Sequence, residues 1–142
     1  MCVLSCHIVM VGSLQALYEI RSSTGKAETD GLPDSIISEF LQIDPSLSRA
    51  IEEASVNFQS LINEMGDNLL SMNEGELSSL LQSDYVNFYS AATVNPYVAI
   101  AARGPWIVTS HGAVIHDNGG YGMLGMGPVS YTHLTLPTKR IV

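Results

Sequence analysis

The stretch WIVTSHGAVIH, residues 106–116, decides the fold class of this chain. Its two ends, residues 106–109 and 113–116, are rich in β-branched and aromatic side chains, which is typical of short strands. The residues between them include Gly112, which can supply the positive φ that a tight connection often requires. The stretch therefore predicts a β-hairpin.

The residues before this hairpin carry helical patterns instead. In residues 34–43 (DSIISEFLQI) the apolar side chains share one helical face. Asp44 followed by Pro45 is typical of an N-cap with proline in the first turn. Residues 47–65 then carry an apolar stripe that stops at Gly66, a residue common just after a helix end. Two consecutive helices are expected here.

A third helix is expected to start at Asn73. Glu76 lies three residues further on, in the spacing of a capping box. The chain as a whole is thus predicted to be mainly α with a short β-hairpin. The acidic side chains of these helices are interpreted as a solvated face: Glu52, Glu53, Glu64, Glu74 and Glu76.

The N-terminal residues 1–20 are apolar but are interrupted by polar side chains, and no basic residue precedes Val3. Neither a signal peptide nor a membrane anchor is expected. Two interpretations fit this segment: a strand and helix start, or an upstream extension that does not belong to the domain. The polar residues 21–31 are interpreted as a linker. The predicted division of the chain is 1–31 (leader and linker), 32–92 (helical extension), 93–127 (hairpin and glycine-rich loop) and 128–142 (tail).

Composition narrows the functions that the chain can have. Its 142 residues suit one domain, and 6 Lys+Arg against 14 Asp+Glu give a net charge of −8. So few cations cannot form a surface for nucleic acid or an anionic membrane. Cys2, Cys6 and His7 are too few for a zinc site, which needs four ligands. We expect no metal site, free thiols and a cytoplasmic location.

Residues 120–125 (GYGMLG) match the dinucleotide-binding pattern G-x-G-x-x-G. That pattern requires a strand directly before it, a helix after it and an acidic residue about 20 positions downstream. The sequence has none of the three in place. NAD binding is therefore not expected.

Residues 94–127 carry several elements in a recognisable order: Gly104-Pro105-Trp106, the turn at residues 110–112, a second strand ending in Asp117, and the glycine-rich stretch to Gly127. This order resembles the N-terminal segment of class III aminotransferases, which are pyridoxal-phosphate enzymes of fold type I. The family continues with His where this chain has Pro128.

The resemblance implies a homodimeric parent enzyme that transfers an amino group from an amino donor to a keto or aldehyde acceptor. It also implies that this segment belongs to the small domain of an α/β fold. The residues near the substrate would be Gly119, Gly120, Tyr121 and Gly122.

The catalytic lysine of such an enzyme would lie beyond this chain. The sequence has two lysines, Lys26 in the polar linker and Lys139 near the C-terminus. Residues 129–142 (VSYTHLTLPTKRIV) resemble the in-frame translation of a sequencing adapter. We therefore expect an N-terminal fragment without catalytic residues, which neither binds pyridoxal phosphate covalently nor turns over. The alternative is a small acidic helical interaction module in which residues 34–81 bind a partner.

Overall fold

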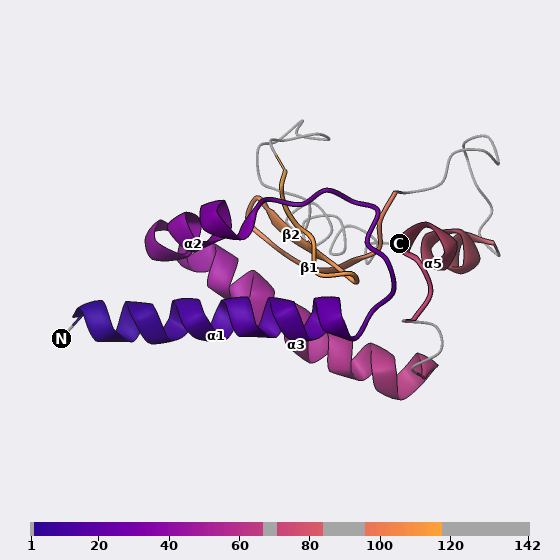
Figure 1. Cartoon of the computed structure of the whole chain (residues 1–142), viewed down its shortest axis with the longest axis horizontal. Coiled ribbons are helices and arrows are strands. Elements are labelled where there is room, and N and C mark those ends of the chain that lie inside the picture. Colours follow the sequence, from indigo (N-terminus) through magenta and orange to yellow (C-terminus); the bar gives the residue numbers. More distant parts are fainter. Residues whose placement is uncertain (1, 67–70, 84–95, 118–142) are drawn as a thin grey trace, which may run out of the picture.

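The computed structural model describes residues 2–66, 71–83 and 96–117, and it shows a mainly helical chain with a small antiparallel sheet (Figure 1). The described helices are α1 (Cys2–Ser22), α2 (Asp34–Ile43), α3 (Pro45–Met65) and α5 (Glu74–Gln82). The strands are β1 (Ala99–Arg103), β2 (Trp106–Thr109) and β3 (Val114–His116), in the order β1-β2-β3. The coarse fold class predicted from the sequence is confirmed.

The predicted hairpin forms from β2 and β3. Ile107 lies opposite Ile115 in an antiparallel register, and Gly112 in the connection has φ +74°. The sequence did not predict β1, which pairs with β2 and contains an irregularity between Ala99 and Ala101. Alanine is a weak strand former, so β1 takes its conformation from pairing with β2 and from packing.

The predicted helix boundaries of α2 and α3 are confirmed. Asp44 caps α3, because its side chain accepts a hydrogen bond from the Ser46 N–H at 2.8 Å. Gly66 ends the helix with φ +77°. Capping also starts α5, where the Asn73 N–H donates to Glu76 Oε2 at 3.3 Å.

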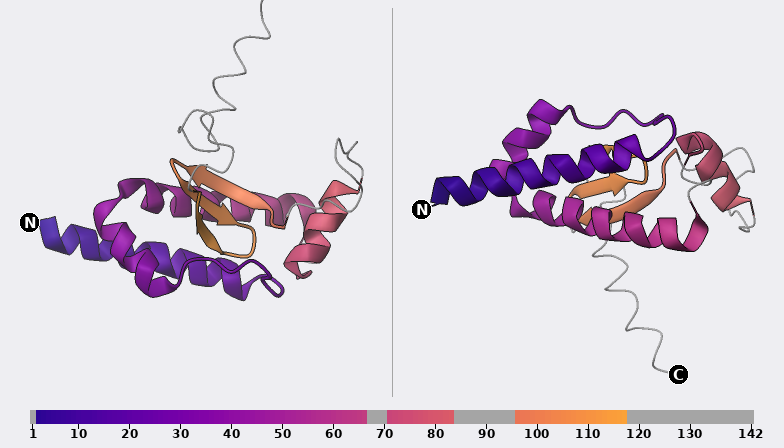
Figure 2. Two further views of the ribbon diagram at one scale, coloured as in Figure 1. Left: turned by 90° about the horizontal axis from the view of Figure 1, so that it is seen from above. Right: turned by 60° about the horizontal axis from the view of Figure 1, so that its bottom comes forward.

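Residues 2–22, for which the sequence left two readings open, form helix α1. It lies beside α3, which in turn packs on β1 and β2 (Figures 1 and 2). Leu17 and Ile20 of α1 are buried in the same core as Ile51 of α3 and Val108 of β2. Segments that the sequence divided at residues 31 and 92 therefore contribute to one core.

The polar segment between α1 and α2 runs past β3. The Leu32 N–H donates to the Val114 carbonyl at 2.8 Å, and a Cβ on Gly31 would lie 2.8 Å from the Val114 nitrogen. This segment thus covers the outer edge of β3, which reduces the exposure of an unpaired strand. None of the helices in residues 2–66 and 71–83 is long and apolar enough to cross a membrane.

Candidate functional site

The four residues predicted to lie near substrate, Gly119, Gly120, Tyr121 and Gly122, fall outside the described residues. The structure does describe the point from which they follow. His116 is the last residue of β3, and the Asp117 N–H donates to the Pro105 carbonyl at 2.7 Å. The backbone is hydrogen-bonded up to the start of the glycine-rich segment.

Four side chains gather at this end of the hairpin, and we call them the strand-end cluster: Phe40, Asp44, Trp106 and His116. The Trp106 ring packs edge-on against Phe40 with centroids 5.0 Å apart, and against His116 at 4.7 Å. The indole is almost completely buried, and its Nε1–H donates to Asp44 Oδ2 at 2.7 Å. The cluster thus joins the α2–α3 corner to the last residue pair of the sheet, Trp106 and His116.

The hydrogen bond from Trp106 has an electrostatic consequence for Asp44. This hydrogen bond lowers the pKa of the Asp44 carboxyl below its ordinary value of 3.8, and desolvation opposes the shift. Hydrogen bonds from Ser46 and the electrostatic influence of the nearby His116 act in the same downward direction on this pKa. A buried indole N–H needs an acceptor, and a carboxylate is a stronger one than a neutral group. Asp44 is therefore held as the anion.

This pKa shift predicts how stability depends on pH. A carboxyl whose folded pKa is depressed contributes stability above its unfolded pKa and loses it as pH falls through the lower, folded value. We therefore expect the free energy of unfolding to fall as pH drops below about 4, the ordinary range of aspartate. In Asp44→Asn the dependence is expected to be shallower. Urea titrations at a series of pH values, followed by the fluorescence of Trp106, measure this, because it is the only tryptophan.

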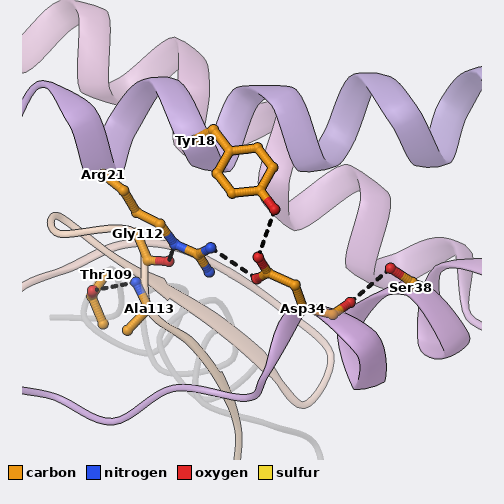
Figure 3. A network of polar contacts seen from close by, with 7 residues as sticks. All are labelled: Tyr18, Arg21, Asp34, Ser38, Thr109, Gly112 and Ala113. Carbon is orange, nitrogen blue, oxygen red and sulfur yellow. Dashed lines mark hydrogen bonds and ion pairs between the residues drawn. The ribbon is translucent and has the colours of Figure 1, made fainter.

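A second polar cluster, shown in Figure 3, links α1 to α2 and to the hairpin turn. Arg21 donates to Asp34 Oδ1 at 2.8 Å and to the Gly112 carbonyl at 3.0 Å, while Tyr18 donates to Asp34 Oδ2 at 2.8 Å. Burial raises the pKa of Asp34, but the Arg21 and Tyr18 hydrogen bonds and the Arg21 charge outweigh it, so the net shift is downward. Asp34 raises the pKa of Tyr18 in return, chiefly through that hydrogen bond. These side chains satisfy one another, and their role is structural.

His111, which the sequence placed in the turn, is buried at 1% exposure. Its Nε2 lies 3.0 Å from the Met72 carbonyl, and its Nδ1 lies 3.0 Å from the Ser110 hydroxyl. Because a carbonyl only accepts, Nε2 carries a proton, and in the neutral ring Nδ1 accepts from Ser110. His111 thus ties the hairpin to the residues before α5. A Ser–His pair this deeply buried has no access to substrate.

The interpretation of Glu74 as part of a solvated face is wrong. Its side chain is fully buried, and Oε2 accepts from the Glu28 N–H at 2.9 Å and the Thr29 N–H at 2.8 Å. The Glu74 N–H donates to the Lys26 carbonyl at 3.0 Å. Among the residues that the structure describes, Oε1 finds no hydrogen-bond partner, although it is buried. Sequence spacing did not reveal this, because the donors lie 45 and 46 positions away.

An open groove of about 310 Å³ lies between α3 and β1. The Asn57 side chain of α3 bridges the two sides of the groove, because its Nδ2 donates to the Ile100 carbonyl of β1 at 2.7 Å. Most of the described lining of the groove is apolar, and Glu64 is the one titratable side chain among the described lining residues. The lining residues are Asn57, Ser60, Leu61, Glu64, Val98, Ala99 and Ile100.

Within the described residues, no group of three or more His, Cys, Asp or Glu side chains could hold a metal ion. Lys26 is exposed on the segment between α1 and α2. Comparison of the chain with protein-family models, with curated proteins and with solved structures gives no match. The strand-end cluster is the candidate site, because it lies at the last described residues of the hairpin, His116 and Asp117.

Proposed function

We propose that this chain is the N-terminal part of a class III aminotransferase of fold type I. The observation that carries the proposal is the order of elements in residues 94–127. The proposal is supported by a hairpin at the place where the resemblance requires two strands, with β3 ending one residue before Asp117. The parent enzyme would transfer an amino group from an amino donor to a keto or aldehyde acceptor.

Under this proposal the present chain supplies one wall of a substrate pocket. Gly119, Gly120, Tyr121 and Gly122 would lie near substrate, in a homodimer located in the cytoplasm. Glycines suit such a wall, because a backbone without Cβ atoms allows a ligand to approach closely. The role of the described residues would be to hold that wall in place.

The described residues do not fit pyridoxal phosphate. A lysine that carries this cofactor needs surroundings that lower the pKa of its amine and hold the ring. Lys26 is exposed. Its backbone carbonyl accepts a hydrogen bond from the Glu74 N–H. The groove between α3 and β1 has no cation among its described lining residues to bind a phosphate. The cofactor would be held by other parts of the parent enzyme.

A cofactor titration tests the part of the proposal that concerns this chain. Pyridoxal phosphate is added to the purified protein and reduced with borohydride, and modified peptides are located by mass spectrometry. We expect no stoichiometric adduct at either lysine, and no difference between the wild type and Lys26→Arg. The proposal would be contradicted by a stoichiometric adduct at one lysine that disappears when that lysine is replaced, in Lys26→Arg or in Lys139→Arg.

Sequencing the source DNA beyond the codon for Gly127 tests the identity of the parent. The proposal requires a reading frame that continues with histidine and later encodes a lysine on a fold type I domain. Genomic DNA that encodes residues 128–142 in their present order would overturn it.

The second candidate is an acidic helical interaction module in which residues 34–81 bind a partner, and the α3 side of the groove belongs to that range. The apolar lining of the groove, with Leu61 and Val98 partly exposed, could accept a side chain of a partner protein. Affinity capture with the full chain, repeated with Leu61→Glu, tests this reading. A partner that is retained by the wild type and lost by Leu61→Glu would favour the module over the enzyme fragment.

A further inference from the structure

We propose that the backbone N–H groups of Glu28 and Thr29 form a carboxylate-binding site, and that the Glu74 side chain occupies this site as an internal ligand. A small monocarboxylate such as acetate would bind there once the Glu74 side chain is removed. The inference goes beyond the proposed function, because it uses neither the glycine-rich segment nor the groove between α3 and β1.

Two adjacent backbone donors point at one oxygen of Glu74. The Glu28 nitrogen lies 2.9 Å from Glu74 Oε2, and the Thr29 nitrogen lies 2.8 Å from the same oxygen. Successive backbone N–H groups that point the same way make anion-binding concavities in proteins. Because hydrogen bonds to an ionised acceptor are stronger than neutral ones, this pair of donors favours a carboxylate over an amide.

The segment that carries these donors is held on both sides by contacts that do not involve Glu74. The Thr24 hydroxyl donates to the Ile20 carbonyl of α1 at 3.0 Å. The Leu32 N–H donates to the Val114 carbonyl of β3 at 2.8 Å. The two donors are therefore positioned before a ligand arrives, so that binding costs less ordering entropy.

The burial of Glu74 indicates that the donors require an acceptor. Its side chain has 0% exposure, and burying a charged group costs free energy unless the group is fully paired. Among the described residues, hydrogen bonds reach Oε2 and leave Oε1 without a partner. An apolar side chain would avoid that cost, but it would leave two N–H groups without an acceptor. The donors, and not the filling of space, therefore explain a carboxylate at this position.

A neighbouring negative charge restricts the ligand to a monoanion. The Glu28 side chain lies against the first turn of α5, since a Cβ on Gly75 would lie 2.6 Å from Glu28 Oε2. Like charges repel more strongly where less water separates them. A dianion such as phosphate is therefore disfavoured, and a single carboxylate group is the ligand class that the site fits.

Helix α5 delivers the internal ligand to the site. Figure 1 shows α5 beside the segment that joins α1 to α2, and the Glu74 N–H donates to the Lys26 carbonyl of that segment at 3.0 Å. Leu77, about one turn further along α5, is buried in the shared core. While α5 is docked in this way, its own carboxylate closes the site to an external one.

Adding acetate to the variant Glu74→Ala tests the proposal. This substitution removes a methylene and a carboxylate, which together have nearly the shape of acetate. Thermal unfolding of the full chain is followed by the fluorescence of Trp106, the only tryptophan. Sodium acetate, up to about 0.5 M, is compared with sodium chloride of equal ionic strength, because a ligand that binds the folded state raises the unfolding midpoint. We expect the variant to have a lower midpoint than the wild type in chloride, and to regain a few degrees in acetate.

Two variants and two further probes separate anion binding from general effects. Glu74→Gln keeps an acceptor oxygen and fills the site, so acetate should raise its midpoint no more than that of the wild type, which reports the general effect of the salt. Leu77→Ala leaves an apolar cavity on the same helix, and no recovery specific to acetate is expected there. Acetamide, a neutral molecule of nearly the same shape, and sodium phosphate should change the midpoint of Glu74→Ala no more than they change that of the wild type.

Three results would overturn the inference: equal effects of acetate on Glu74→Ala and Glu74→Gln, equal recovery of Glu74→Ala with acetamide or phosphate, or a wild-type midpoint for Glu74→Ala in chloride. If Glu74→Ala is unfolded in chloride, acetate is expected to restore a cooperative transition, and a chain that stays unfolded in acetate would also overturn it. None of these results bears on the lysine adduct or the source DNA, so this proposal and the proposed function can fail separately.

Discussion

Replacing Trp106 with alanine is expected to lower the free energy of unfolding by about 3–5 kcal/mol, the usual cost of emptying a buried aromatic position. The side chain is among the largest fully buried ones in the described residues. It contacts Phe40 and His116 and bonds Asp44. A loss of this size is a large part of the total stability of a small domain, which is typically about 5–15 kcal/mol. Urea unfolding followed by circular dichroism measures it.

Trp106→Phe separates the volume of the ring from its hydrogen bond. The phenyl group fills part of the site, but the bond to the Asp44 carboxylate is lost. We therefore expect this variant to lose only about 1–2 kcal/mol, since Asp44 is half-buried and water can replace the donor. Val56→Ala, at a 66% exposed position of α3, is the control with little expected change. Equal stabilities for Trp106→Ala and Val56→Ala would show that the strand-end cluster is not part of the core.

The second large loss of stability is expected at Leu17, which lies in the segment that the sequence analysis assigned to a leader and linker, residues 1–31. Leu17→Ala should cost about 2–5 kcal/mol, because the side chain is fully buried in the shared core. Val11→Ala on the same helix is the control: Val11 is 53% exposed, so a change within about 0.5 kcal/mol is expected. The same urea titration compares the two variants.

Removing α1 altogether extends this comparison. A chain that starts at residue 32 loses Leu17 and Ile20 from the core and Arg21 from its bonds to Asp34 and Gly112. We expect it to lose cooperative unfolding and to bind a dye specific for exposed apolar surface. Wild-type-like cooperativity in the shortened chain would instead establish residues 1–31 as a separable leader.

The local elements could be predicted because their signals are local. Asp44-Pro45 and Gly66 define the ends of α3 through backbone groups within a few residues. The β2–β3 hairpin is equally local, since Gly112 connects two β-rich runs that pair with each other. Strand β1 was missed, because Ala99–Arg103 has weak intrinsic preference for a strand and depends on its neighbours.

The candidate site was predictable only in part. The strand-end cluster joins Trp106 to Asp44, which lies 62 positions earlier in the chain, and no local pattern connects the two residues. Glu74 was assigned to a solvated face, because helical spacing alone does not show which face a distant loop will cover. Contacts of this kind follow from chain packing and leave no periodic signal.

By itself, the sequence determined the mainly helical composition, the caps, the hairpin and the acidic character of the chain, because each depends on neighbouring residues or on composition. The tertiary structure decided that α1 joins the core, that Glu74 is buried and that Asp44 holds Trp106. The physical reason is that burial and hydrogen bonding join groups far apart in the chain, and only packing brings them within reach of one another.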